Sequence, residues 1–221
     1  MTEPTIDQYL LSTCLFIIDE LNISYNSLND CNLKKIADEK FNEMDIAVRI
    51  GYPFKQMVHY TVSDSNKNRS LKSNHDLYIE SKNFKVEIKY LKNWKSTSNT
   101  YSVSKTWKEF QIDFDWILNE VVTNKGNCAL VIGWFNCVPS LSQLIQLGTG
   151  SGSHPKVNES RICYFPFLTK MKNPTYTSDL VYNYDFAYKP TGLNLVGIPK
   201  DACSCLFLGK ESDCFHFAIY Y

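Results

Sequence analysis

Apolar residues recur with helical spacing in three segments of the chain. The first runs from Ile6 to Leu21 and the second from about Asn32 to Ile50, with Asn32 as the expected N-cap and Gly51 as the expected end. The third runs from Val103 to Val121, where the apolar positions form one broad stripe. Its members are Val103, Trp107, Phe110, Phe114, Ile117, Leu118 and Val121. We expect three amphipathic helices.

The runs between these helices are typical of β-strands. QMVHYTV (56–62) is β-prone, HDLYIESKNFKVEIK (75–89) predicts two strands around a polar turn, and CALVIGWF (128–135) is continuously apolar. A strand of the last kind is usually covered on both faces, in the interior of a sheet. Because a helix that connects two strands generally makes them neighbours, we expect an α/β fold with a mixed sheet.

The last third of the chain is β-prone and rich in aromatic residues. After a short helix expected within 139–147, five strand-like runs follow: ICYFPF, LVYNYDFAY, LNLVGI, CLFLG and CFHFAIYY. We place a soft boundary near residue 150. Residues 1–150 would hold the N-terminal helix and an α/β core, and residues 151–221 a β-rich C-terminal extension packed on that core.

The two strands within 75–89 have one apolar face and one charged face. A two-residue turn at Lys82-Asn83 would pair Leu77 with Ile88 and Ile79 with Val86 on the apolar face. On the charged face the same register pairs Glu80 with Lys85, Tyr78 with Glu87, and Asp76 with Lys89. Since side chains alternate along a strand, Asp76, Glu87 and Lys89 are predicted to share one face.

These three residue types suit the hydrolysis of a phosphodiester bond. Two carboxylates can hold Mg²⁺, a hard cation that prefers oxygen ligands and keeps several waters. Such an ion activates its bound water and polarises the phosphate. A lysine two residues beyond the glutamate points the same way, so it can orient that water or contact the phosphate.

Asp76, separated by ten residues from Glu87-Ile88-Lys89, resembles the motif of the PD-(D/E)XK nuclease superfamily, although His75 stands where that motif has proline. The order of the expected elements from Asn32 to Phe135 is similar to the family's restriction-endonuclease-like αβββαβ core. The resemblance implies Asp76, Glu87 and the Ile88 carbonyl as ligands of Mg²⁺, with Mn²⁺ able to substitute. It implies Lys89 as the catalytic lysine.

Many members of that family also carry a glutamate on the first core helix. Glu43 is the candidate, because it continues the line of Ile36, Ala47 and Ile50 and therefore leans toward the sheet. An ordinary exposed helix glutamate remains the alternative.

The charge distribution is uneven although the net charge is zero. Residues 1–50 carry nine acidic and four basic residues, whereas residues 51–100 carry nine basic and four acidic residues. The basic segment can meet phosphates if it folds onto one face. Candidate nucleic-acid contacts are Lys92, Lys105, Lys108 and Tyr78, with ordinary surface side chains as the alternative.

The eight cysteines do not form a convincing metal motif. A tight hairpin in CSCLFLGKESDCFHF would pair Cys205 with Cys214 and Cys203 with His216. Structural zinc sites favour C-x₂₋₄-C knuckles, so buried thiols are the preferred interpretation and zinc the alternative. No signal peptide and no apolar run long enough for a membrane span is visible, and we expect a cytoplasmic protein without a membrane partner.

Together these features predict a Mg²⁺-dependent nuclease, a DNA endonuclease acting on double-stranded DNA, with a homodimer as one arrangement that suits cutting two strands. Two alternatives remain. One is a non-catalytic interaction or inhibitor protein on the same fold, which the neutral net charge favours. The other is an RNA-cleaving, toxin-type nuclease, which no residue separates from the DNA enzyme.

Overall fold

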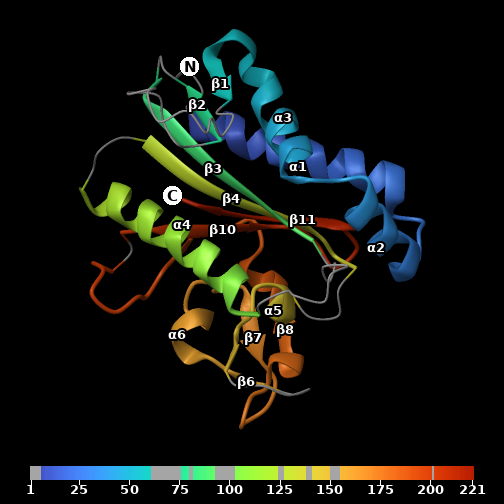
Figure 1. The fold of residues 1–221 in the computed structure, drawn as a ribbon, viewed down its shortest axis with the longest axis vertical. Helices are drawn as coiled ribbons and strands as arrows, with labels where there is room; N and C mark the ends of the chain where they lie inside the picture. The colour runs from blue at the N-terminus through green and yellow to red at the C-terminus, as the bar shows by residue number, and fades with distance from the viewer. Residues whose placement is uncertain are drawn as a thin grey trace.

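The protein is built around one mixed β-sheet, seen in the computed structural model in Figure 1. The structure describes residues 6–60, 76–79, 82–92, 103–123, 127–137, 141–149, 155–200 and 202–221. Within these residues seven strands form the sheet in the order β1-β2-β3-β4-β11-β10-β9. They are β1 (Val58–Tyr60), β2 (Leu77–Ile79), β3 (Phe84–Leu91), β4 (Asn127–Phe135), β9 (Thr191–Gly192), β10 (Ser204–Leu208) and β11 (Phe215–Tyr220).

The centre of the sheet is a parallel pair. β1, β2 and β3 form an antiparallel meander, and β4 then lies parallel to β3. The helix α4 (Val103–Thr123) lies between these two strands in the chain and supplies the crossover that a parallel pair requires. β4 is buried from Cys128 onward, which confirms the interior strand expected from its unbroken apolar run.

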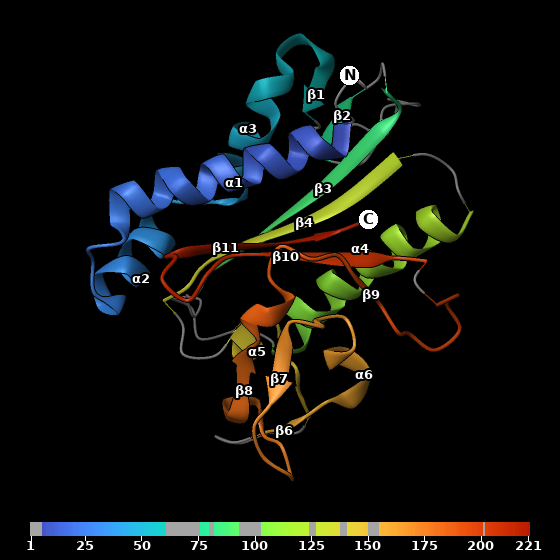
Figure 2. The same ribbon diagram turned by 180° about the vertical axis from the view of Figure 1, so that it is seen from behind.

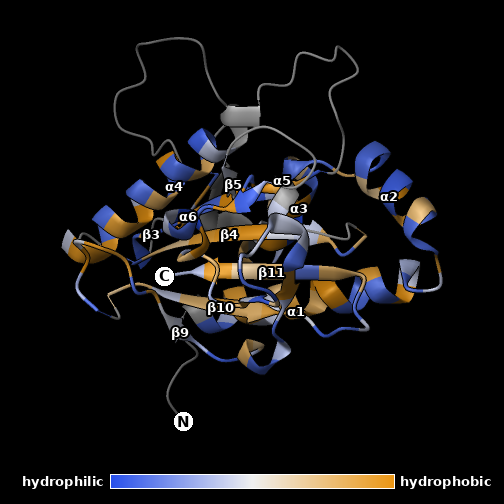
Figure 3. Ribbon diagram, turned by 90° about the horizontal axis from the view of Figure 1, so that it is seen from below, coloured by the Kyte–Doolittle hydropathy of each residue, from blue (hydrophilic) through white to orange (hydrophobic). Residues whose placement is uncertain are grey.

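Helices cover both faces of the sheet. α1 (Ile6–Tyr25), α2 (Asp30–Glu39) and α3 (Glu43–Gly51) lie on one face, and α4 lies on the other (Figure 2). The small elements α5 (Leu141–Leu144), α6 (Glu159–Ile162), β7 (Leu168–Lys170) and β8 (Leu180–Tyr182) lie on the α4 side. Two apolar cores result, one on each face. Orange apolar residues accordingly fill the central strands, whereas the helices alternate between orange and blue (Figure 3).

The remaining elements are short. They are η1 (Tyr52–Met57), β5 (Gly148–Thr149), β6 (Lys156–Val157), η3 (Thr177–Asp179) and η4 (Tyr184–Phe186). β5 pairs with β6 and β7 pairs with β8, outside the main sheet. Among the described helices, none combines the length and apolar character needed to cross a bilayer.

The helix expected from Asn32 to Ile50 is wrong, because the chain forms two helices there. Asn29, not Asn32, caps α2, and its side chain accepts the Asn32 N–H. Asn42 then starts α3 through a capping box with Asp45, in which each side chain accepts the other residue's backbone N–H. The new start places Glu43 in the first turn of α3.

The predicted register of the β2–β3 hairpin is also wrong, by two residues. Leu77 pairs with Val86 and Ile79 with Phe84, so the connection is four residues long instead of two. Asn83 at its end has φ of 46°, a left-handed conformation that asparagine tolerates better than most residues. A shift of two keeps every side chain on its predicted face, because the pleat also repeats every two residues.

Residues 151–221 contribute β10 and β11 to the main sheet, and β11 pairs with β4 along six residues. β10 and β11 therefore continue the sheet that β1 to β4 begin. Two of the five aromatic runs, 162–167 and 193–198, form turns and coil in place of strands. The short helix expected within 139–147 is α5.

Candidate functional site

The candidate site lies where β2 begins beside β3. The Asp76 carboxylate precedes β2 and accepts a hydrogen bond from the Ile88 backbone N–H, with 2.7 Å between Oδ2 and N. Continuing the observed register by one residue sets Asp76 opposite Glu87, whereas the sequence predicted Lys89 opposite Asp76. The two carboxyl-bearing residues are therefore direct cross-strand neighbours.

Glu43 reaches the same edge of β3 from the first turn of α3. Its Oε2 accepts a long hydrogen bond from the Tyr90 backbone N–H at 3.4 Å. The N–H and C=O of one strand residue point to the same side, so the Ile88 carbonyl faces the edge that Asp76 and Glu43 occupy. Glu43 is thus brought to the site, as its sequence position predicted, and is half-buried rather than fully exposed.

Lys89 lies on the face of β3 that α4 covers. Its Nζ is 3.0 Å from Glu87 Oε1 and 3.6 Å from Asp113 Oδ2. The three side chains are largely buried, with exposed fractions of 22% for Lys89, 15% for Glu87 and 12% for Asp113. The ammonium is therefore held between a strand carboxylate and a helix carboxylate.

Asp113 is the site residue that the sequence prediction missed. It lies on α4 between Phe110 and Phe114, inside the apolar stripe. Glu120, seven residues later, is also buried and pairs with Lys85 at 2.8 Å. An acidic residue within an apolar helical stripe is the signal that could have identified both, because a buried carboxylate needs a partner.

Carboxylates outnumber the cation in this cluster. The four carboxyl groups of Glu43, Asp76, Glu87 and Asp113 face the single ammonium of Lys89, which leaves three negative charges uncompensated when all are ionised. Burial raises the pKa of Glu43, and the nearby Asp76 and Glu87 carboxylates raise it further against the opposing effect of Lys89. Burial likewise raises the pKa of Asp113 to about 7.

The pKa of Lys89 shows the opposite balance. Burial lowers this pKa, but the carboxylates of Glu43, Asp113 and Glu87 outweigh that effect and raise it above its ordinary value. Lys89 is therefore a firmly charged ammonium near neutral pH. It can act as a fixed cation toward a phosphate, and it does not act as a neutral base.

The donors at this edge suit a hard divalent cation. They are all oxygen atoms, and their excess negative charge is the feature that Mg²⁺ or Mn²⁺ would neutralise. Within the described ranges, however, no group of three or more His, Cys, Asp or Glu side chains is arranged so that it could hold a metal ion. A bound ion would therefore require these carboxylates to rearrange, for example by rotation of Glu87 away from Lys89.

The other predicted contacts are more dispersed. Tyr78 pairs with Lys85 instead of Glu87, and its hydroxyl donates to Asn83 Oδ1 at 3.3 Å. Lys92 directly follows β3 and is half-buried, and Lys108 is exposed on α4. The side chain of Lys105 lies outside the described residues. Glu80, predicted opposite Lys85, also lies outside them.

The zinc alternative fails on register. β10 and β11 pair Cys205 with Tyr220 and Leu208 with Phe217, so Cys205 and Cys214 lie at opposite ends of the hairpin. The thiols of Cys203, Cys205 and Cys214 are buried, and burial raises the pKa of Cys214 to about 11. Buried, protonated thiols were the preferred interpretation, and the structure confirms it.

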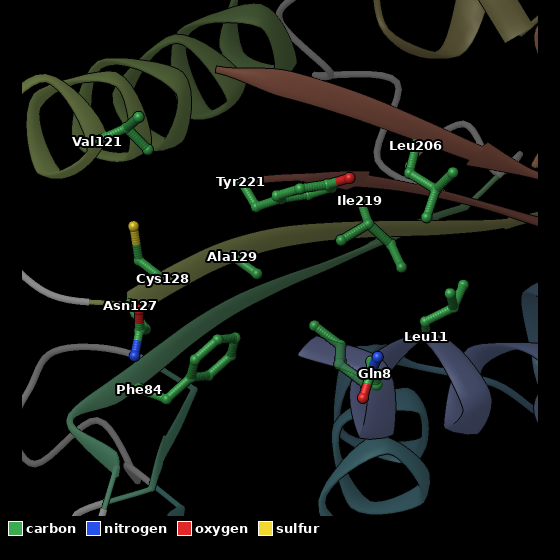
Figure 4. A pocket seen from close by; sticks show the side chains of 11 residues that line it. Gln8, Leu11, Phe84, Val121, Asn127, Cys128, Ala129, Leu206, Ile219 and Tyr221 are labelled. Carbon is green, nitrogen blue, oxygen red and sulfur yellow. The ribbon is translucent and has the colours of Figure 1, made fainter. Parts of the chain in front are cut away.

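A separate apolar cavity of about 350 Å³ lies at the start of β3 and β4 (Figure 4). Phe84, Ala129, Leu206 and Ile219 line it, together with Cys128. Burial raises the pKa of the Cys128 thiol to about 11. Among the described residues, no carboxylate or ammonium side chain lines this cavity, so it does not share the charge chemistry of the site.

Comparison of the chain with protein-family models, with curated proteins and with solved structures finds no match in any of the three.

Proposed function

We propose that this protein is a Mg²⁺-dependent nuclease that hydrolyses phosphodiester bonds in double-stranded DNA. The observation that carries the proposal is the grouping of Asp76, Glu87 and Lys89 at one edge of β3, with Glu43 arriving there from a separate helix. Glu43 lies 33 positions or more before the other three residues in the chain. Two separate segments thus supply an oxygen-rich, negatively charged edge beside one buried cation.

The order of the elements supports the same proposal. α3, the β1–β2–β3 meander, α4 and β4 follow one another as in the αβββαβ core that the motif resembles, with β4 parallel to β3. Asp76 immediately precedes the second strand of that order, and Glu87 and Lys89 lie on the third. A chance Asp…Glu-x-Lys pattern does not require this order of helices and strands, so the shared order supports the motif.

Each residue has a distinct proposed role. Asp76 and Glu87 would hold the ion with the Ile88 carbonyl, and Glu43 would add charge or a water-mediated contact. The ion, when bound, supplies an activated water and polarises the phosphate. Lys89 keeps its proton and directs its ammonium at the attacking water or at a phosphate oxygen, where negative charge develops.

The test is a cleavage assay on plasmid, linear DNA and RNA with Mg²⁺ or Mn²⁺. Wild type is compared with Asp76→Asn and Lys89→Ala, and Lys85→Ala serves as the matched control because Lys85 lies on the same face of β3, four residues earlier. We expect wild type and Lys85→Ala to cleave DNA, and the two site variants to lose at least about 100-fold in rate. Unchanged cleavage by both site variants would remove the site assignment.

A non-catalytic interaction protein on this fold is the second candidate. The observation that favours it is the 3.0 Å ion pair between Lys89 and Glu87, which neutralises two of the proposed functional groups internally. The same assay separates the candidates, because an interaction protein leaves DNA and RNA intact at every metal concentration. Cleavage of RNA alone would instead favour the toxin-type nuclease.

A further inference from the structure

Two buried ion pairs connect α4 to β3, and they differ in the distance between nitrogen and oxygen. Lys85 Nζ and Glu120 Oε2 are 2.8 Å apart, a full charge-assisted hydrogen bond. Lys89 Nζ and Asp113 Oδ2 are 3.6 Å apart, beyond hydrogen-bond distance. The lysines are four residues apart on one strand face and the acids seven apart on one helix face, so the two pairs are equivalent in placement.

The looser pair leaves a buried oxygen without a hydrogen bond. Asp113 is 9% exposed, and its Oδ2 finds no hydrogen-bond partner among the described residues. The helix fixes its place, because the neighbouring Phe114 is fully buried in the core. A buried carboxylate with an unmet hydrogen-bonding capacity is costly for stability alone, so a purely structural role explains Glu120 better than Asp113.

Lys89 divides its contacts between Asp113 and Glu87. Glu87 belongs to the proposed metal-binding pair, and binding an ion would draw its oxygens toward that ion. Lys89 would then lose its closer partner, whereas Asp113 stays in place on a packed helix. Without Asp113, the carboxylates acting on the ammonium would be those of Glu43 and Glu87. Both belong to the proposed metal site, so the ammonium would compete with the ion for them.

We propose that Asp113 is a positioning residue that holds the Lys89 ammonium on the α4 side of the site and so keeps Glu87 available to the metal ion. This inference rests on the proposed nuclease function. It assigns Asp113 no contact with substrate. Asp113 acts only by fixing the position of the Lys89 ammonium. Glu120, although similar in burial and chemistry, has no such effect because it pairs with Lys85.

The test compares Asp113→Asn with Glu120→Gln, each of which removes one negative charge from the same helix face with little change in shape. Steady-state cleavage of a DNA duplex is measured at about pH 8 over a range of Mg²⁺, below the thermal midpoint of each variant. Without DNA, the rise of the thermal midpoint with Mg²⁺ is measured as well, and Asp113→Asn is expected to need more Mg²⁺ than Glu120→Gln for the same rise. We expect Asp113→Asn to lower kcat by about 10–100-fold, the usual effect of losing a supporting contact to a site, with KM for DNA within about 2-fold. Glu120→Gln is expected to keep kcat within about 3-fold of wild type, even if the substitution lowers the free energy of unfolding.

Two further variants separate positioning from general damage. Asp113→Glu restores the charge and is expected to recover at least about half of the lost activation free energy. On a Lys89→Ala background, Asp113→Asn is expected to cause no additional loss, because its effect requires the ammonium. Full additivity on that background, or an equal kcat loss in Glu120→Gln, would overturn the positioning role.

The outcome for wild type keeps the two proposals distinguishable. If wild type cleaves and depends on Lys89 while Asp113→Asn matches wild type, the positioning role fails and the nuclease proposal stands. If wild type cleaves neither DNA nor RNA with either metal, both fail.

Discussion

The Asp76 carboxylate accepts the Ile88 backbone N–H at 2.7 Å, so one side chain both completes the hydrogen bonding of β3 and carries charge at the candidate site. Ile88 itself is fully buried in the core beneath α1 and α3. A buried N–H left without an acceptor costs about 1–3 kcal/mol. The structural and the functional contributions of Asp76 can therefore be separated by the choice of substitution.

Asp76→Asn retains an oxygen acceptor for the Ile88 N–H, whereas Asp76→Ala removes it. We expect Asp76→Ala to lower the free energy of unfolding by about 1–3 kcal/mol and Asp76→Asn by less than about 1 kcal/mol. Both variants are expected to lose Mg²⁺-dependent cleavage. Urea unfolding monitored by circular dichroism measures the first effect. Equal stability of the two variants would show that the hydrogen bond contributes nothing.

Adding Mg²⁺ or Mn²⁺ is expected to raise the thermal midpoint of the wild-type protein. The carboxylates gather around Lys89 only in the folded state, so a cation that neutralises them binds the folded state alone. Such a ligand stabilises the folded state by about 2.7 kcal/mol at 100 times its Kd. For a chain of this size that corresponds to a rise of roughly 5–10 °C. Differential scanning fluorimetry after EDTA treatment, with increasing metal, measures the shift.

Glu87→Gln and Glu120→Gln form the matched pair for this measurement. Each removes one carboxylate that is paired with a lysine of β3, but Glu87 alone belongs to the proposed metal site. We expect the metal-dependent shift to disappear in Glu87→Gln and to persist in Glu120→Gln. A shift that survives in Glu87→Gln would place the ion elsewhere.

The sharing of one face by Asp76, Glu87 and Lys89 was predictable because it depends only on the alternation of side chains along a strand. The predicted register was wrong by two residues, yet an even shift leaves the faces unchanged. The neighbours did change, and Asp76 came to lie opposite Glu87. That difference depends on the number of residues in the turn. Asn83 tolerates the left-handed conformation that the four-residue turn uses, but the sequence around it does not specify a turn of four residues rather than two.

Contacts between distant segments were less predictable. Glu43 was identified as a candidate, but the Asn42–Asp45 capping box that starts α3 was overlooked, since apolar periodicity continues across the break between α2 and α3. Asp113 was missed because the α4 stripe was defined by its apolar members. The pairing of Cys205 with Tyr220 depends on the long β10–β11 connection, for which local turn rules give no register.

The stability of the apo protein is expected to fall as pH rises from about 4 to about 7. Burial raises the pKa of Asp113 from 3.8 to about 7, so in this window the folded state holds a proton that the unfolded chain has released. The free energy of unfolding decreases with pH wherever the folded state binds more protons. Asp113→Asn removes this proton, and its thermal midpoint in EDTA is therefore expected to decline less than that of wild type between about pH 5 and pH 8, by a few degrees.

Glu120→Gln is again the comparison for the pH series. If wild type and Asp113→Asn decline in parallel while Glu120→Gln differs, the proton resides on another group than Asp113. A wild-type midpoint that rises across the whole window would contradict a raised Asp113 pKa.

Gly209 is expected to be intolerant of a side chain because it lies against His216. A Cβ at Gly209 would come within 1.8 Å of His216 Cδ2, and the His216 ring is stacked on Trp134 and Phe207 with interplanar angles of 17° and 9°. The ring is fully buried, so it cannot move aside without disturbing that stack. We expect Gly209→Ala to lower the free energy of unfolding by about 2–4 kcal/mol through overpacking and backbone strain.

Gly197→Ala is the control, since Gly197 also has positive φ, 82°, but no atom lies within 4 Å of its added Cβ. That variant is expected to cost about 1 kcal/mol from backbone strain alone, and equal losses in urea unfolding would refute the steric contact with His216.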